Sequence, residues 1–449
     1  MKLALVFFAL ASAHSADLTR EVKTIVDLAH SAPPEIFANT ALALAETGVI
    51  PVGPAQTDLL EQAFTAAAQS HEPVRLFAMP NLGPDTPPTF RAKAATFGLD
   101  ALSLQSRALQ RLAIADRRKA LELFQNLRRP NFDSRPCGDP LLADPTAYYE
   151  MVDAVFKSSG QNVQLLQGVL AGLRSPGELA PAAHLLLTVN LKPEEMELLL
   201  TTFASNMGNT APDFRSFTST VDDLRASLVL LATHGRTRDV SAQVLAEGFR
   251  HLVTSQLSAA RCDGDFGGGM NAAEWFNASA AFRGALPPIS PQEIQSSQRL
   301  GGYQAASYFD SPDANRLWEM LGFLRLNPGL GPRPEAERAT VAWRGQAENF
   351  LRDYFAWTPS GSSVDVLHKR MTLLNGLLAL APAGDTHDRT LAEAVRVLSA
   401  SSVEREAPAE WFYEVKALVD SIGPGKPKLM ETFRQSGDIS LTLFAQTSH

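Results

Sequence analysis

Apolar residues recur every three to four positions along most of the chain, and this spacing is typical of amphipathic α-helices. The first such segment is 17–29, and Pro33-Pro34 ends it because proline cannot continue the backbone hydrogen bonds of a helix. Another helix is expected to begin at Pro145, since proline is tolerated at the first helical position. The same spacing predicts helices over 35–47, 57–70, 98–114, 116–127, 162–173, 181–189, 193–206, 220–233, 240–261, 272–283, 291–300, 313–324, 334–357, 364–380, 388–399, 408–421 and 427–435.

Only the end of the chain departs from this spacing. Residues 439–445 alternate between apolar and polar side chains, which is the pattern of a β-strand. A tail packed on the last helix fits the same residues. Both interpretations remain open at this point.

Two short motifs mark helix starts. Ser175-Pro176-Gly177-Glu178 and Ser290-Pro291-Gln292-Glu293 each place a Ser cap before a Pro and a Glu three residues after the Ser. This order predicts a capping box, in which the Ser and Glu side chains satisfy backbone N–H groups that the first turn leaves free. Asp116 is expected to cap the helix that follows it.

The predicted fold class is therefore all-α, an array of antiparallel helix pairs in the form of an α-solenoid or, alternatively, an α/α toroid. Residues 130–144 contain several prolines and no helical periodicity, which predicts a connecting loop. This loop divides the chain into N-terminal helical repeats over 17–129 and a central and C-terminal helical array over 145–449.

One helix pair resembles a known repeat. The segment 98–127 resembles a tetratricopeptide-type repeat, with Ala108, Ala120 and Phe124 at its small and aromatic packing positions, although Arg111 stands where that repeat has an aromatic residue. The chain as a whole resembles exported bacterial helical-repeat proteins. No catalytic residue carries over from this resemblance.

The first sixteen residues have the features of a secretory signal peptide. Met1-Lys2 gives a positive start, an apolar run follows over 3–11, and Ala11-Ser12-Ala13 has the small-x-small form of a cleavage site, with Ala16 as a second candidate. The apolar run is shorter than the ~20 residues that a membrane span requires. We therefore expect a periplasmic or secreted protein without a transmembrane segment; a frayed N-terminal helix is the alternative.

Composition and charge exclude some functions. Of the 449 residues, 45% are hydrophobic, which is enough to form a sizeable core. The chain is also longer than the length that a single hydrophobic core usually supports. The net charge of −8 argues against nucleic-acid binding, because a phosphate-binding surface needs an excess of Lys and Arg. The nine histidines include no His-x-x-x-His pair, so a zinc-protease motif is absent.

The two cysteines, Cys137 and Cys262, lie in predicted loops. In an exported protein a single pair of cysteines predicts one disulfide, here between positions 125 residues apart. Two free thiols are the alternative. Without histidines at suitable spacing the two cysteines do not predict a zinc site.

The loop after Cys262 has the one spacing that approaches a metal site. Counted from Asp263, the segment 263–274 resembles an EF-hand calcium loop, with Asp263, Asp265, Asn271 and Glu274 at ligand positions 1, 3, 9 and 12. Gly267 at position 5 offers no side-chain oxygen, which weakens the match. The alternative is a Gly-rich turn with solvated carboxylates.

The expected function is a protein-binding or scaffolding surface, because stacked helix pairs form long grooves and no catalytic signature interrupts them. An unknown protein or envelope component is the expected partner, with calcium as the only cofactor considered. The alternative is a secreted α/α-toroid enzyme acting on polysaccharide, for which Asp263, Asp265 and Glu274 near Trp275, and Glu319 near Trp318, are candidate acidic and aromatic residues.

Overall fold

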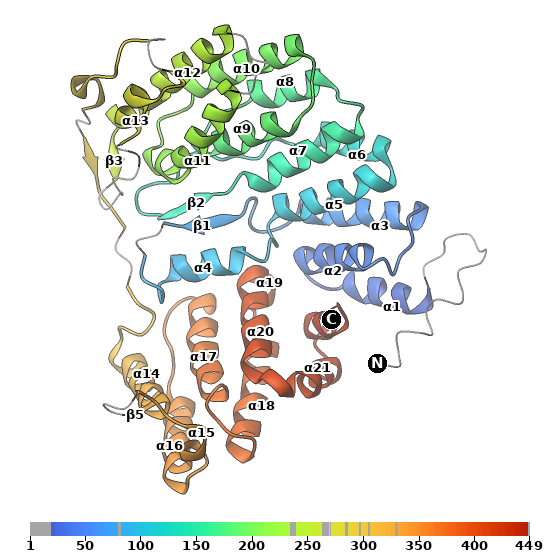
Figure 1. The fold of residues 1–449 in the computed structure, drawn as a ribbon. Helices are drawn as coiled ribbons and strands as arrows, with labels where there is room; N and C mark the ends of the chain where they lie inside the picture. Colours follow the sequence, from blue (N-terminus) through green and yellow to red (C-terminus); the bar gives the residue numbers. More distant parts are fainter. Residues whose placement is uncertain are drawn as a thin grey trace.

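The computed structural model describes residues 19–79, 82–233, 239–262, 269, 271–282, 286–295, 298–303, 306–327 and 331–447. Within these ranges the chain forms 22 α-helices and six strands of two or three residues, so the all-α prediction is confirmed (Figure 1). The predicted signal peptide, 1–16, lies outside the described residues. No helix of the described ranges is long and apolar enough to cross a membrane.

The first part of the chain contains thirteen of these helices. They are α1 (Arg20–Ala29), α2 (Pro34–Glu46), α3 (Pro54–Ala67), α4 (Pro87–Ala95), α5 (Ala101–Ala115), α6 (Arg117–Asn126), α7 (Thr146–Ser158), α8 (Val163–Ala171), α9 (Leu179–Thr188), α10 (Pro193–Gly208), α11 (Phe214–Thr233), α12 (Asp239–Ser258) and α13 (Ala272–Ala278), with the 3₁₀ turn η1 (Pro176–Glu178) before α9.

The second part of the chain contains the remaining nine. They are α14 (Pro312–Arg325), α15 (Glu335–Arg338), α16 (Val341–Ala356), α17 (Ser363–Leu378), α18 (Asp385–Ser399), α19 (Val403–Glu406), α20 (Pro408–Ile422), α21 (Lys426–Gln435) and α22 (Ile439–Thr447). The strands pair as β1 (Leu76–Ala78) with β2 (Leu141–Ala143), β3 (Arg261–Cys262) with β4 (Arg299–Leu300), and β5 (Leu326–Asn327) with β6 (Gly331–Pro332).

Most predicted helices are present, and the capping signals act as expected. Asp116 accepts a hydrogen bond from the Lys119 amide at 3.0 Å and so caps α6. Ser175 and Glu178 form the predicted capping box at the start of η1. The Ser290 motif also forms its capping box, but only the 3₁₀ turn η3 (Pro291–Ile294) follows it.

The predicted helix over 291–300 is therefore wrong. Its second half contains β4, which pairs in parallel with β3, and the Arg261 amide donates to the Gln298 carbonyl at 3.1 Å. Backbone pairing with a distant segment has replaced the local helix. The predicted helix over 334–357 is likewise divided into α15 and α16, because Thr340 caps a new helix by accepting from the Trp343 amide at 3.3 Å.

The strand interpretation of 439–445 is also wrong, and α4 was missed. Residues 439–447 form α22, whose start is capped by Asp438 through the Leu441 amide at 2.9 Å. This helix packs against α1, α2 and α21, so it buries both of its faces and its sequence shows no amphipathic spacing. Helix α4 lies between the predicted helices 57–70 and 98–114, where the apolar spacing predicted none.

Eight helices of the first part lie in two rows (Figure 1). One row contains α3, α5, α7, α9 and α11, each in contact with the next, and the other contains α8, α10 and α12. The approach of α10 to α12 requires a glycine, because a Cβ at Gly248 would lie 2.4 Å from the Ala204 carbonyl oxygen. The solenoid form of this array, with the toroid as its alternative, stays a prediction.

The described residues form two hydrophobic clusters. The first contains buried residues between Val22 and Ile289, and the second contains buried residues between Tyr308 and Ala445. Two helices cross from one to the other. Phe90 of α4 belongs to the second cluster, while Leu443 of α22 belongs to the first.

Phe90 is the aromatic residue through which α4 enters the second cluster. Its side chain is 2% exposed and its ring stacks on His368 at a centroid distance of 3.8 Å. The rings of Tyr308 and Tyr413 meet it edge-on at 6.2 and 5.3 Å. This packing attaches the C-terminal helices to the segment between β1 and α5.

The cysteine prediction is confirmed. The Sγ atoms of Cys137 and Cys262 lie 1.90 Å apart, at the distance of a disulfide. On the Cys137 side the backbone is also held by Arg215 of α11, which donates to the carbonyls of Cys137 and Asp139 at 3.0 and 2.8 Å. The predicted loop is thus fixed to α11 and to the end of α12.

We expect Phe90→Ala to lower the free energy of unfolding by about 3–5 kcal/mol, because the truncation leaves a cavity among packed rings. The matched control is Phe323→Ala, since Phe323 is 61% exposed and its truncation should cost less than about 0.5 kcal/mol. Urea unfolding of both variants measures the difference. Equal effects would show that Phe90 does not join the two clusters.

Reduction of the disulfide should destabilise the protein by about 4–5 kcal/mol, because the bond closes a loop of 125 residues in the unfolded chain. The measurement is urea unfolding with and without a reductant. The double variant Cys137→Ser/Cys262→Ser serves as the control and should be insensitive to the reductant. A reductant effect of equal size on the variant would contradict the assignment.

Candidate functional site

The residues of the predicted calcium loop are only partly described. Asp263 and Asp265 lie outside the described residues. Asn271 precedes α13, and its Oδ1 atom accepts a hydrogen bond from Arg225 at 3.1 Å, while the Arg225 guanidinium also bonds Asp222. Glu274 on the first turn of α13 is exposed. Within the described residues no group of three or more His, Cys, Asp or Glu could hold a metal ion, and the calcium site stays a prediction.

The tryptophans considered for carbohydrate binding both have partners within the fold. Trp275 lies under the Arg225 guanidinium, 5.4 Å from ring centroid to Cζ, and packs edge-on against Phe249. Trp318 of α14 stacks on Phe309 at 4.6 Å. Neither tryptophan lines the groove of the described structure that forms the candidate site.

That groove has a volume of about 600 Å³ and lies at one face of the first row of helices. We call it the acidic groove. Its walls are β2 and the residues after it, one side of α7, the start of η1 and α9, and one side of α11. The lining residues are Phe77, Ala143, Asp144, Pro145, Thr146, Tyr149, Glu150, Asp153, Gly177, Ala180, Pro181, His184, Leu185, Thr188, Ser216, Ser219, Thr220 and Asp223.

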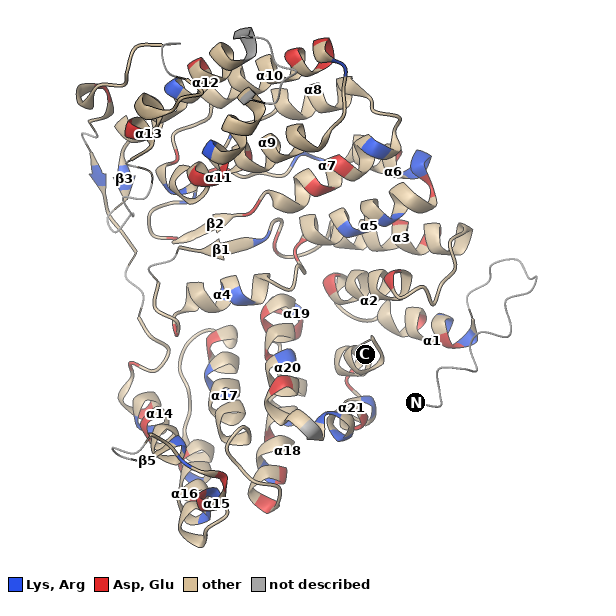
Figure 2. Cartoon of the chain, in the orientation of Figure 1, with Lys and Arg blue, Asp and Glu red and all other residues tan. Residues whose placement is uncertain are grey.

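The acidic groove contains four carboxylates and, among the described residues that line it, no Lys or Arg. Asp144 is paired with Arg75, whose Nε lies 2.9 Å from its Oδ2, and Asp153 is paired with Lys157 at 2.6 Å. Glu150 of α7 and Asp223 of α11 are exposed and have no ion-pair partner in the described part of the chain. Figure 2 shows acidic positions on both of these helices. The groove therefore has two uncompensated negative charges on different walls.

Five Ser and Thr side chains and the Tyr149 hydroxyl accompany the carboxylates in the groove. Ser216 is buried and donates to Asp213 at 2.5 Å, whereas Ser219 is exposed. Apolar surface comes from Ala180, Pro181 and Leu185 of α9. Carboxylates and hydroxyls around an apolar surface suit a ligand that has both cationic groups and apolar parts.

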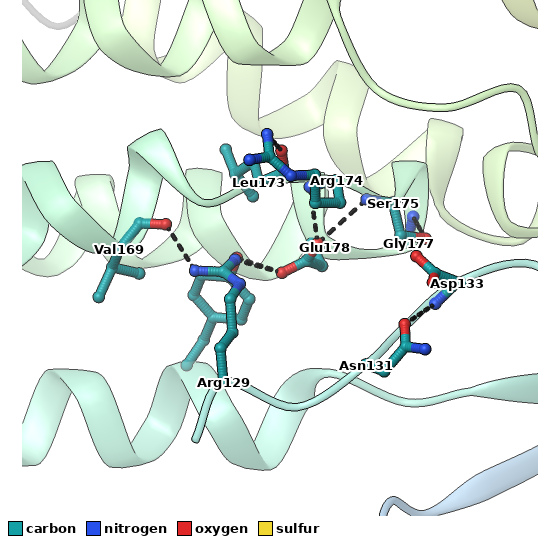
Figure 3. A network of polar contacts seen from close by, with 10 residues as sticks. Arg129, Asn131, Asp133, Val169, Leu173, Arg174, Ser175, Gly177 and Glu178 are labelled. Atoms are coloured by element: carbon teal, nitrogen blue, oxygen red, sulfur yellow. Dashed lines mark hydrogen bonds and ion pairs between the residues drawn. The ribbon is translucent and has the colours of Figure 1, made fainter. Parts of the chain in front are cut away.

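A buried carboxylate, Glu178, connects elements that form walls of the acidic groove through a network of polar contacts (Figure 3). Its side chain is 2% exposed. Its Oε1 atom accepts from Arg129 at 2.6 Å and from the Tyr149 hydroxyl at 3.2 Å. Its Oε2 atom accepts from the amides of Arg174 and Ser175, each at 3.0 Å. Both oxygens are therefore fully used, as a buried charge requires.

Arg129 completes this network. It donates a second hydrogen bond to the Val169 carbonyl of α8 at 2.9 Å, and its guanidinium lies 5.3 Å from the centroid of the Tyr148 ring. The network thus connects the start of the 130–144 loop with α7, the end of α8 and η1. These contacts fix α7 relative to η1 and α9, which form two walls of the groove.

Burial and the ion pair set the protonation states in this network. Burial raises the pKa of the Tyr149 hydroxyl well above its usual value, and the nearby charge of Glu178 acts in the same direction. Burial is the largest single influence on Arg129 and would lower its pKa, but the charge of Glu178, the nearby Tyr149 and Tyr148 hydroxyls and the hydrogen bond to Glu178 together raise it, so the net shift of the pKa is upward. Tyr149 therefore stays a neutral donor and Arg129 stays a cation at physiological pH.

Sequence analysis identified one part of this site and missed the rest. The capping-box motif correctly placed Glu178 at a helix start, where its Oε2 bonds the Ser175 amide. The motif gave no sign that the other oxygen binds Arg129, 49 residues earlier in the chain. Glu150 and Asp223 had no local signal either, because each is an ordinary acidic residue on a helix.

Comparison with known proteins found no family, no curated protein and no solved structure that matches this chain. The resemblance of 98–127 to a tetratricopeptide-type repeat stays a prediction.

Replacement of Glu178 by Gln should lower the free energy of unfolding by about 3–5 kcal/mol, because it leaves the largely buried Arg129 without its charge partner. The NH₂ group of the Gln side chain would also face one of the two sets of donors that now bond the carboxylate oxygens. Glu194→Gln on the exposed start of α10 is the matched control and should change stability by less than about 0.5 kcal/mol. Thermal and urea unfolding measure both. A neutral Glu178→Gln would refute the role given to this carboxylate.

Proposed function

We propose that the protein binds a segment of a partner polypeptide in the acidic groove, as a binding or scaffolding protein outside the cytoplasm. The observation that carries the proposal is the combination of a groove of about 600 Å³ with four carboxylates and no Lys or Arg among its described lining residues. Such a surface attracts cations and repels anions. The proposed partner segment therefore contains Lys or Arg.

The charge balance within the groove supports a basic ligand. Asp144 and Asp153 are already paired with basic residues that do not line the groove, so they hold the fold together and add little net charge. Glu150 and Asp223 remain available for a ligand. Because these two carboxylates lie on α7 and α11, with α9 between the two helices, the ligand is expected to cross α9.

The groove also has features of a binding surface in addition to its charge. Two of its walls, α7 and the η1–α9 segment, are fixed relative to each other by Glu178, Tyr149 and Arg129, so the ligand meets a preformed surface there. The apolar residues of α9 give contact area for the uncharged parts of a peptide. Export of the protein is the expectation from its first sixteen residues, and the disulfide is compatible with an oxidising compartment.

Binding of a basic peptide should depend on both unpaired carboxylates. The probe is an acetylated and amidated octapeptide of alternating Lys and Val, with binding measured by calorimetry at low and at physiological salt. Removal of one exposed charge is worth about 0.2–1 kcal/mol, so Glu150→Gln and Asp223→Asn should each weaken binding roughly 1.5- to 5-fold. The double variant should show about the product of the two effects.

The control for this experiment is Glu194→Gln, which removes an equal charge from an exposed position that does not line the groove. It should leave the affinity unchanged apart from a small salt-dependent effect of net charge. If the double variant binds the peptide as tightly as the unmodified protein, or if no binding occurs at low salt, the proposal fails.

A further inference from the structure

The acidic groove borders a strand edge. In the pairing of β1 with β2, Phe77 is opposite Leu142 and Leu76 is opposite Ala143. The Asp144 amide donates to the Arg75 carbonyl at 2.8 Å, which makes Arg75 and Asp144 a hydrogen-bonded pair. Such pairs alternate along an antiparallel ladder, so Phe77 and Leu142 form the next one.

Ala143 is therefore in a non-hydrogen-bonded pair, and its N–H and C=O groups point away from β1. Neither group has a hydrogen-bond partner within the described part of the chain. Ala143 and Asp144 both line the acidic groove. Because neighbouring strand residues point their side chains to opposite faces, a groove that meets both residues runs along the edge of β2.

The two edges of the β1–β2 sheet have different surroundings. The outer edge of β1 is in contact with α4, which covers it (Figure 1). At the near end of β2 the Leu141 amide is bonded to the Asp139 carboxylate at 3.1 Å. At Ala143, by contrast, the backbone N–H and C=O have no partner among the described residues, and this residue lines the groove. An unpaired strand edge is a template for the backbone of another chain.

We propose that the partner segment binds in an extended conformation as a third strand beside β2, with its backbone paired to Ala143 and its basic side chains directed to Glu150 and Asp223. The inference rests on the proposed function and adds the conformation of the ligand. A strand of three or four residues spans roughly 10–13 Å, a length that fits the short open edge of β2. Main-chain pairing supplies affinity, and the carboxylates select Lys and Arg.

The test compares three peptides on the full protein. The first is the alternating Lys-Val octapeptide, the second carries N-methyl groups on every Lys, and the third carries them on every Val. Successive N–H groups of a strand point to opposite sides, so only one of the two methylated sets lies against β2. We expect one methylated peptide to bind at least 10-fold more weakly than the parent peptide and the other to bind within about 3-fold.

A second measurement follows the protein backbone. Hydrogen exchange of the Ala143 amide, resolved by mass spectrometry with electron-transfer fragmentation, should slow at least 10-fold when the parent peptide is bound. The Leu142 amide is paired with β1 in the free protein and serves as the internal control. Its exchange should change less than that of Ala143.

The outcomes separate the two proposals. If all three peptides bind equally and Glu150→Gln with Asp223→Asn weakens each of them, the proposed function stands and strand pairing is overturned. If spermine binds the protein and Glu150→Gln with Asp223→Asn weakens that binding, but no peptide binds, the ligand is a small polyamine cation and both proposals fail. If neither spermine nor any peptide binds at low salt, the proposed function fails and strand pairing fails with it.

Discussion

The acidic groove depends on one buried interaction, the contact of the Glu178 carboxylate with Arg129. A carboxylate with a 2% exposed side chain is tolerated only because four donors surround it, and these donors come from separate parts of the chain. The ion pair connects the loop after α6 to the start of α9, while the Tyr149 hydroxyl connects α7 to the same oxygen. Loss of any one donor would leave a buried charge partly unsatisfied, so the groups hold their positions together.

The segment 130–144 has the least regular sequence of the described chain and some of its most specific contacts. Its start is fixed by Arg129, its centre by the disulfide of Cys137 and by Arg215, and its end by β2 and the pair of Asp144 with Arg75. A segment without helical periodicity gains little stability from local hydrogen bonds. Long-range contacts fix it instead, and through them it forms one wall of the acidic groove.

Two side chains attach the C-terminal helices to the first part of the chain, because each packs in the hydrophobic cluster of the other part. Phe90 of α4 packs among rings of the second hydrophobic cluster, and Leu443 of α22 packs in the first. Because each cluster contains a residue from the other part of the sequence, the two parts share buried surface. This arrangement leaves the acidic groove, which is lined by β1, β2 and helices of the first row, away from the C-terminal helices.

The sequence by itself determined most of the helices, their caps and the disulfide. Helical periodicity and capping are local, because they depend on residues three or four positions apart, and a single cysteine pair has only one intramolecular partner choice. Ser175 and Glu178 are an example, since their spacing alone identified the capping box.

Only the tertiary structure decided the remaining features. Three features depend on contacts between residues far apart in the sequence: the helix at 439–447, the pairing of β4, within 291–300, with β3, and the pairing of β1 with β2. The acidic groove has the same origin, because Glu150 and Asp223 line one groove only when α7, α9 and α11 pack side by side. A local sequence pattern carries no information about which helix faces pack together. The groove is formed by residues of several helices that pack together, so the sequence alone did not reveal it.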